Sequence, residues 1–459
     1  MKSLKVSQFV RSENRVRQPR RQKTQPLTRS SRAYPKTKSI LEKETAFLER
    51  MTKDPKKMKY LVLVGDGMGD YPLDALGGKT PLEVAKTPNM DRIAACRVGL
   101  AKTIPEGMEP GSDVANLSLL GYDPAAYHTG RGPLEAASMG ITLQPNQVAF
   151  RMNLVTLDMR SDQEIIMVSH SAGDLSTEEA ADMVKELKRS FETPAIQIHQ
   201  GVAYRHLLVW DGGPEKAVTI PPHDVLDQNM ASYLRDASGN PVPDMIRRSW
   251  ELLKEHPINR KRRDKGLKQA NSIWPWGQGK APKLPSFYGS HGLRGGVISA
   301  VDLLKGIGVY AGFVPIFVEG ATGFLNTNYK GKAEAALENL KALDFVFLHV
   351  EAPDEAGHAG NHQEKIQAIE NFDRKVVGTV LEGLMEFEDY RIMVVSDHLT
   401  PVVKKTHTNE PTPFAWATRD ELQSTHEGLP FTEKAAKESG LLFEKGHALM
   451  ASFLSHRHE

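Results

Sequence analysis

The sequence is short of cysteine, of net charge and of long apolar runs, and each shortage excludes a class of protein. Among 459 residues there is one cysteine, Cys96, so no internal disulfide framework can form and a cytoplasmic protein is expected. Lys and Arg number 59 against 57 Asp and Glu, so the folded body carries no field suited to nucleic acid. The longest apolar runs, such as Tyr60–Val64 and Phe345–Val350, have the length of strands, and no membrane span is expected.

Residues 1–57 differ in composition from the rest of the chain. Residues 1–40 contain twelve Lys or Arg and one acidic residue, Glu13, with no sustained apolar period. Such a segment cannot bury enough apolar surface to offset its ordering entropy, so we predict a disordered basic extension before Met58. Three roles stay open: an upstream extension of a true start at Met58, an organellar targeting segment, and a tail that binds a partner such as nucleic acid.

From Met58 onward the sequence predicts an α/β fold. Lys59–Val64 is continuous in apolar residues, which is typical of a strand covered on both faces of a parallel sheet, and Phe345–Val350 and Arg391–Val395 are two further predicted strands. Thr87-Pro88 is a predicted helix start, with Thr87 as the N-cap. Polar residues follow each of the three strands, and open α/β sheets place their sites just beyond the carboxyl ends of parallel strands.

The middle of the chain, residues 130–290, is predicted to be an inserted α+β lid domain. It contains the alternating runs Gln147–Leu157 and Ala203–Trp210, a helical stretch Thr177–Phe191, and Trp274-Pro-Trp276, which we expect to pack the insert. Residues 58–129 and 291–459 then form the core domain around a central, mainly parallel sheet.

Carboxylate and imidazole side chains occur in four groups at widely separated points: Asp66; Asp354 with His358; Asp397 with His398; and His407. A two-cation site needs about six protein ligands and an oxygen between the cations, and Ser112 offers a hydroxyl nucleophile. Mixed Asp and His ligation suits Mn, Zn or Co. Because Pro353 precedes Asp354 and Gly357 precedes His358, we predict that this pair lies on a loop.

Seven segments, in family order, resemble the archaeal-type cofactor-independent phosphoglycerate mutases of the alkaline phosphatase-like metalloenzyme superfamily. The resemblance covers about residues 58–420. The segments are Asp66-Gly-Met-Gly-Asp70, Thr87-Pro-Asn-Met-Asp91, Pro110 to Pro124, Thr129 to Ala136, Gly320-Ala-Thr-Gly323, His349 to His358, and Ser396-Asp-His398. It implies interconversion of 3- and 2-phosphoglycerate through a phosphoserine, with no 2,3-bisphosphoglycerate required.

The resemblance also implies roles for individual residues. Asp66, Ser112, Asp397 and His398 would bind one divalent cation, and Asp354, His358 and His407 the second. Mn²⁺ is the expected metal, with Mg²⁺, Co²⁺ or Zn²⁺ as alternatives. Ser112 would be the nucleophile; Gly111 lets backbone approach the phosphate closely, and a helix starting after it would offer its N-terminal amides to an anion.

The lid would grip the small phosphorylated substrate, and its specificity stays open. The candidates for contacts with carboxylate or phosphate are Arg131, Arg151, Arg205, His206, His223 and Asp224, chosen because arginine suits bidentate recognition of either group. Asp113 and Asn116 fit substrate contact or capping equally well, and His349 is expected to be a core histidine. Sequences with stretches like His170-Ser-Ala-Gly173 and Ser272–Gly279 have also been proposed as homoserine kinases, so another acceptor is the alternative. All seven ligand positions carry competent residues, which disfavours a degenerate scaffold.

Overall fold

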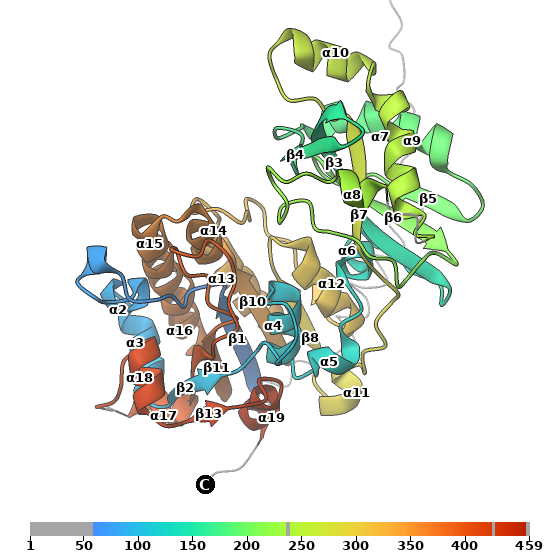
Figure 1. The fold of residues 1–459 in the computed structure, drawn as a ribbon. Helices are drawn as coiled ribbons and strands as arrows, with labels where there is room; N and C mark the ends of the chain where they lie inside the picture. Colours follow the sequence, from blue (N-terminus) through green and yellow to red (C-terminus); the bar gives the residue numbers. More distant parts are fainter. Residues whose placement is uncertain (1–57, 236–238, 425–426, 456–459) are drawn as a thin grey trace, which may run out of the picture. The chain divides into compact units, whose positions relative to one another are not determined.

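The computed structural model describes residues 58–235, 239–424 and 427–455, which contain two β-sheets (Figure 1). The disordered extension predicted for residues 1–57 lies outside the described residues. No helix among the described residues is long and apolar enough to cross a membrane.

The first sheet has eight strands in the order β13-β2-β12-β11-β1-β10-β8-β9 and is mainly parallel. Only β12 runs antiparallel to both of its neighbours. The bounds are β1 Lys59–Gly65, β2 Val98–Ala101, β8 Gly295–Ile298, β9 Val314–Pro315, β10 Phe345–Val350, β11 Tyr390–Ser396, β12 Thr412–Thr418 and β13 Leu442–Phe443. The predicted α/β class with a mainly parallel sheet is confirmed.

Strand β1 lies at the centre of this sheet because it is apolar on both faces. It pairs in parallel with β10 on one side and β11 on the other, and all seven of its residues are buried. Leu61 and Leu63 enter one hydrophobic core, whereas Tyr60, Val62 and Val64 enter another. Successive strand residues point to opposite faces, so these two cores are the two layers of helices that cover the sheet.

Different helices form the two layers. The face of Leu61 packs against residues of α2, α3, α13, α15 and α16, and the face of Val62 against residues of α4, α6, α11, α12 and α19. The helix bounds in this part of the chain are η1 Asp74–Leu76, α2 Pro81–Val84, α3 Pro88–Ala94, α4 Ser112–Leu119, α5 Pro124–Tyr127, α6 Arg131–Ser138, α11 Phe287–His291, α12 Asp302–Tyr310, α13 Tyr329–Leu340, α14 Ala352–Ala359, α15 His362–Phe372, η2 Asp373–Val377, α16 Gly378–Leu384, α17 Arg419–Gln423, α18 Glu433–Glu438 and α19 Ala448–Leu454.

The second sheet lies between residues 147 and 279 and has its own hydrophobic core. Its strands run in the order β4-β3-β6-β5, and β7 pairs with β3. Trp274 and Trp276 of β7 are buried in that core, as expected. The bounds are β3 Gln147–Ser161, β4 Glu164–Ser169, β5 Ile196–His199, β6 Arg205–Asp211, β7 Ser272–Gly279, α7 Thr177–Phe191, α8 Ala231–Leu234, α9 Val242–Leu253 and α10 Pro257–Asp264.

Two local predictions differ from the structure. Asp354 and His358 lie on a helix, α14, so the predicted loop is wrong. Pro353 is tolerated because it occupies the first turn, where its missing N–H costs nothing. Helix α3 does begin at Pro88, but Thr87 does not cap it: its hydroxyl bonds the Asp91 carboxylate, and no side-chain cap bond forms.

Candidate active site

Three neighbouring parallel strands deliver most of the predicted ligands. Asp66 follows β1, Asp354 lies in the first turn of α14 just after β10, and Asp397 and His398 follow β11. Because β10, β1 and β11 are adjacent and parallel, their carboxyl ends meet at one edge of the sheet. Side chains that are some 290 to 330 positions apart in sequence therefore lie side by side.

Asp66, Ser112, Asp397 and His398 form the first group. His398 Nε2 is the common neighbour: it lies 3.1 Å from Ser112 Oγ, 3.3 Å from Asp66 Oδ1 and 3.6 Å from Asp397 Oδ2. The Asp66, Asp397 and His398 side chains are at most 1% exposed. Two carboxylates and an imidazole are thus shielded from water, and the partly buried Ser112 hydroxyl meets them from the side.

Asp354, His358 and His407 form the second group. His358 Nε2 lies 3.2 Å from Asp354 Oδ2 and 3.0 Å from His407 Nε2, and His407 Nε2 lies 3.5 Å from Asp354 Oδ1. A carbonyl oxygen can only accept, so His358 Nδ1, 3.0 Å from Lys405 O, carries a proton. In the neutral ring the lone pair is then on Nε2 and faces the group. The structure brings all seven residues predicted as ligands into these two groups.

The electrostatics of both groups favour positive charge. Burial, and then the charges of Asp397 and Asp354, raise the pKa of Asp66 well above its usual range. Asp66 Oδ1 is buried and has no hydrogen-bond partner among the described residues. Burial opposes protonation of His358, yet its contact with Asp354 raises the pKa of His358 to about 9. An unpartnered carboxylate oxygen and an imidazole that attracts positive charge are what divalent cations require, so the residues fit two metal ions.

Ser112 occupies the first position of α4, as the sequence predicts for a helix start after Gly111. Its two helical neighbours are structural supports. Asn116 Nδ2 donates to Asp397 Oδ2 at 2.8 Å and to Ser112 O at 2.8 Å. Asp113 Oδ2 accepts from His128 Nε2 at 2.8 Å and from Arg131 Nε at 3.3 Å. Both residues therefore hold neighbouring groups in place beside the hydroxyl.

Arg131, Arg151 and His223 gather around one indole. The guanidinium of Arg151 lies 4.6 Å from the centroid of the Trp276 ring, that of Arg131 lies 5.8 Å away, and the His223 ring lies 5.2 Å away. Burial, followed by the charges of Arg131 and Arg151, lowers the pKa of His223 to about 3. The two guanidiniums are partly buried and already paired, Arg131 with Asp113 and Arg151 with Glu135, and His223 is exposed beside them. Guanidiniums against an indole suit an anion.

The other three predicted contacts lie in different surroundings. The Arg205 guanidinium lies 5.9 Å from the Tyr204 ring centroid. Burial raises the pKa of Asp224, and the positive charge of Arg131 offsets part of that rise. His206 is 1% exposed, and its Nδ1 accepts from the Gly201 N–H at 3.2 Å, so it supports the turn before β6.

Two histidines that were not predicted to be site residues lie near the site, one beside the first metal group and one beside the cluster around Trp276. His349 is fully buried on β10, as expected of a core residue, but its Nε2 lies 3.0 Å from Asp66 Oδ2. The second, His170, lies in the cluster around Trp276. Its ring centroid is 6.3 Å from that of His223 and 5.7 Å from that of Tyr204. The signal for His349 was available: it is a polar side chain in an otherwise apolar strand that ends at the predicted site.

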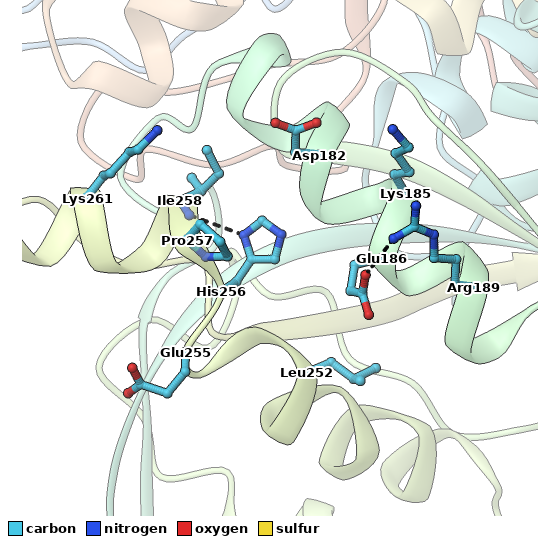
Figure 2. A pocket seen from close by; sticks show the side chains of 10 residues that line it. All are labelled: Asp182, Lys185, Glu186, Arg189, Leu252, Glu255, His256, Pro257, Ile258 and Lys261. Atoms are coloured by element: carbon cyan, nitrogen blue, oxygen red, sulfur yellow. Dashed lines mark hydrogen bonds and ion pairs between the residues drawn. The ribbon is translucent and has the colours of Figure 1, made fainter.

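A surface pocket lies elsewhere, between α7 and the segment joining α9 to α10 (Figure 2). Its volume is about 490 Å³, and its lining mixes acidic and basic side chains. None of the predicted site residues lines it. The lining residues are Asp182, Lys185, Glu186, Arg189, Leu252, Glu255, His256, Pro257, Ile258 and Lys261.

Known proteins resemble the chain over nearly its whole described length. The family model described as 2,3-bisphosphoglycerate-independent phosphoglycerate mutase matches residues 94–259, and that described as type I phosphodiesterase / nucleotide pyrophosphatase matches residues 224–447. A probable 2,3-bisphosphoglycerate-independent phosphoglycerate mutase of Geobacter sulfurreducens is 49% identical over 400 residues, 86% of this chain and 100% of that protein. A 2,3-bisphosphoglycerate-independent phosphoglycerate mutase of Methanothrix thermoacetophila is 49% identical over 396 residues, which cover 86% of this chain and 98% of that protein.

Solved structures share the fold. A Pyrococcus horikoshii protein matches with a TM-score of 0.71 and 31% identity, covering 88% of this chain and 99% of that one. The cofactor-independent phosphoglycerate mutase of Thermoplasma acidophilum matches with a TM-score of 0.56 and 24% identity, covering 86% and 99%. The predicted α/β class with a central, mainly parallel sheet is confirmed, and a second sheet lies between residues 147 and 279.

Proposed function

We propose that this chain, which belongs to the family of 2,3-bisphosphoglycerate-independent phosphoglycerate mutases, interconverts 3-phosphoglycerate and 2-phosphoglycerate. One observation carries the proposal: the Ser112 hydroxyl, at the start of α4, lies 3.1 Å from His398 Nε2 and beside two groups of metal-ligand type. A serine in contact with such groups is what transfer through a phosphoserine needs. Because the serine carries the phosphoryl group between positions, no 2,3-bisphosphoglycerate is needed.

Two divalent cations complete the proposed site. We assign Asp66, Ser112, Asp397 and His398 to one cation, and Asp354, His358 and His407 to the other. When bound, the cations neutralise phosphoryl charge and lower the pKa of the serine hydroxyl. Three of the six non-serine ligands are imidazoles, which favours Mn²⁺, Co²⁺ or Zn²⁺ over Mg²⁺, and we propose Mn²⁺.

The reaction divides into two transfers at Ser112. In the first, Ser112 Oγ attacks phosphorus; the Oγ–P bond forms, the P–O3 bond breaks, and the hydroxyl proton replaces the phosphoryl group on O3. The products are phosphoserine and glycerate. In the second, the glycerate C2 oxygen attacks the same phosphorus; the O2–P bond forms, the Oγ–P bond breaks, and the proton from O2 returns to Ser112 Oγ, which gives 2-phosphoglycerate and the free serine. Amides at the N-terminus of α4 would hold phosphoryl oxygens during both transfers.

Residues 130–290 act in this proposal as a lid over the core formed by residues 58–129 and 291–459. Glycerate must turn over before the second transfer, and water must be kept out because it would hydrolyse the phosphoserine. We assign the anionic groups of substrate to Arg131, Arg151, Arg205 and His223, with Asp224 beside them. His206 is left out because its ring is buried and its Nδ1 is used by the Gly201 amide.

The test is a coupled assay of purified protein with 3-phosphoglycerate, run beside homoserine plus ATP. We expect 2-phosphoglycerate to form without added 2,3-bisphosphoglycerate, and no phosphorylation of homoserine. Phosphorylated homoserine without mutase activity would instead assign the site to another acceptor. The proposed setting is the cytoplasm, supported by the single cysteine, with a small phosphorylated substrate as the partner and neither nucleic acid nor membrane bound by the folded part.

A further inference from the structure

We infer that Thr400 is a positioning residue that couples the two metal groups by hydrogen-bonding one ligand of each through a single hydroxyl. The inference rests on the proposed function in one respect: it takes both groups to bind cations. Thr400 Oγ1 lies 2.5 Å from Asp354 Oδ1, in the second group, and 3.2 Å from His398 Nδ1, in the first. The threonine is fully buried, so no water competes for these contacts.

The direction of the two hydrogen bonds follows from the groups involved. A carboxylate only accepts, so the one hydroxyl proton of Thr400 points to Asp354. The hydroxyl oxygen must then accept from His398, which places the ring proton on Nδ1. His398 Nε2 is left with its lone pair, facing Ser112 Oγ and Asp66 Oδ1. Thr400 therefore selects the tautomer in which His398 can be a ligand.

The backbone around Thr400 holds its hydroxyl in this position. The Thr400 N–H donates to Gly69 O at 3.2 Å, and Thr400 O accepts from Lys365 Nζ at 2.9 Å. Lys365 is buried, and its ammonium also bonds Gly69 O at 3.0 Å and Asp70 Oδ2 at 2.7 Å. All three ammonium donors thus have acceptors, and the loop after β1 is tied to the loop after β11.

Two glycines allow the close approach on which these contacts depend. A Cβ on Gly67 would lie 2.5 Å from Thr400 Oγ1, and a Cβ on Gly357 of α14 would lie 2.5 Å from Thr400 O. The threonine is therefore enclosed by the segments that carry Asp66, Asp354 and His398. Its hydroxyl therefore lies close to both ligands.

A shared hydroxyl makes the two cations interdependent. A cation in the first group fixes His398, which fixes the Thr400 hydroxyl and, through it, the Asp354 carboxylate. The second cation then meets a ligand that is already oriented, so it binds more tightly than it would alone. Loss of the hydroxyl should weaken both cations, since partners that orient metal ligands are commonly worth 10- to 100-fold in affinity.

The experiment titrates Mn²⁺ into metal-free full-length protein, following free Mn²⁺ by electron paramagnetic resonance and heat by calorimetry. We compare wild type with Thr400→Val, Thr400→Ser and Thr412→Val. Thr412 is the matched control: it is fully buried in β12, and its hydroxyl has no partner among the described residues. Two sites and a dinuclear Mn signal are expected for the wild type.

Thr400→Val should lose about tenfold or more in affinity at both sites, together with the cooperativity between them. Thr400→Ser and Thr412→Val should bind like wild type. Wild-type affinity in Thr400→Val, or loss at one site alone, would overturn the inference; if that protein does not fold, Thr400→Ala decides in the same way. The wild-type titration and the coupled assay test the proposed function separately. Two bound cations without mutase activity would refute the proposed function but would not contradict the coupling between the sites.

Discussion

At the scale of single residues, Ser112 is the group that the proposed chemistry cannot replace. Its oxygen faces His398, and Asn116 holds both its carbonyl and the Asp397 carboxylate. Asn116 does not depend on the serine hydroxyl for either bond. Removal of that hydroxyl should therefore remove the chemistry and leave the metal groups assembled.

We expect Ser112→Ala to keep its fold and most of its Mn²⁺ binding while losing turnover by at least about 10³-fold. Rapid quench with ³²P-labelled 3-phosphoglycerate should show label on the wild-type protein and none on the variant. Ser290→Ala, at an exposed position on α11, serves as the control and should be unchanged. Near wild-type turnover in Ser112→Ala would rule out the covalent route.

The residue scale also shows what a sequence can and cannot predict about a site. Asp66, Asp354 and Asp397 follow apolar strands, and that position alone predicted that they would meet. His349 lies inside such a strand, where alternation predicts only burial, and its contact with Asp66 depends on the register between β1 and β10. Thr400 was not singled out because its two partners come together only in the folded protein.

At the scale of elements, close packing of α12 against α6 fixes the helix that carries Arg131. A Cβ on Gly306 of α12 would lie 1.9 Å from Leu134 O of α6, so no side chain fits between them. Helix α6 in turn approaches β3, where a Cβ on Gly132 would lie 2.2 Å from Ala149 O. Small residues thus set the distance between α12, α6 and β3.

Gly306→Ala should lower the free energy of unfolding by about 1–3 kcal/mol, because overpacking outweighs the gain in helix propensity. Urea unfolding followed by circular dichroism measures the change. Gly289→Ala, on the short helix α11, would place its Cβ 3.7 Å from its nearest neighbour, Ser286 Cβ, and should be neutral or slightly stabilising. Equal stability of the two variants would contradict this account of the packing.

A partly buried glutamate at the start of α18 gives the fold a pH dependence. Glu433 accepts from Asp70 N–H at 3.0 Å and from the Thr80 hydroxyl at 2.8 Å, yet burial raises its pKa to about 7. The folded protein holds this proton more tightly than the unfolded chain, whose glutamate pKa is about 4.3. The resulting stability is complete below about pH 4.3 and is lost as the pH rises through about 7.

Glu433→Gln should remove this contribution, so the Tm of the metal-free variant should fall less than that of wild type between pH 5.5 and pH 8. Differential scanning calorimetry at the two pH values tests it. Glu438→Gln, at the exposed end of the same helix, should keep the wild-type dependence. A Glu433→Gln protein with the wild-type pH slope would show that another group titrates.

Element boundaries were predicted well where one physical effect dominates. Phe345–Val350 and Thr177–Phe191 match β10 and α7 because continuous apolar runs and 3.6-residue periodicity are strong local signals. Helix α14 was missed because Pro353 and Gly357 were weighed as breakers. Its first turn accepts the proline, and the glycine is needed because Thr400 O approaches it, which is a tertiary contact.

At the scale of the whole molecule, the cations should contribute to stability as well as to reaction. Each cation at about 100 times its dissociation constant would add about 2.7 kcal/mol, because its ligands are brought together only in the folded chain. Exhaustive chelation should therefore abolish turnover and lower the Tm by several degrees, and Mn²⁺ should restore both. Full activity in excess chelator, with no metal by elemental analysis, would refute the two-metal assignment.

The central position of β1 has a consequence for synthesis on the ribosome. Tyr60 pairs with Phe345 on β10 and Arg391 on β11, so β1 emerges long before either partner. At about 5–20 residues per second, this apolar strand waits roughly 15–60 seconds for β10. The strands of the second sheet, within residues 147–279, can pair meanwhile. Nascent chains halted before β10 should therefore expose β1 to chaperones. Both cations should bind only after the last ligand in the sequence, His407, has left the ribosome.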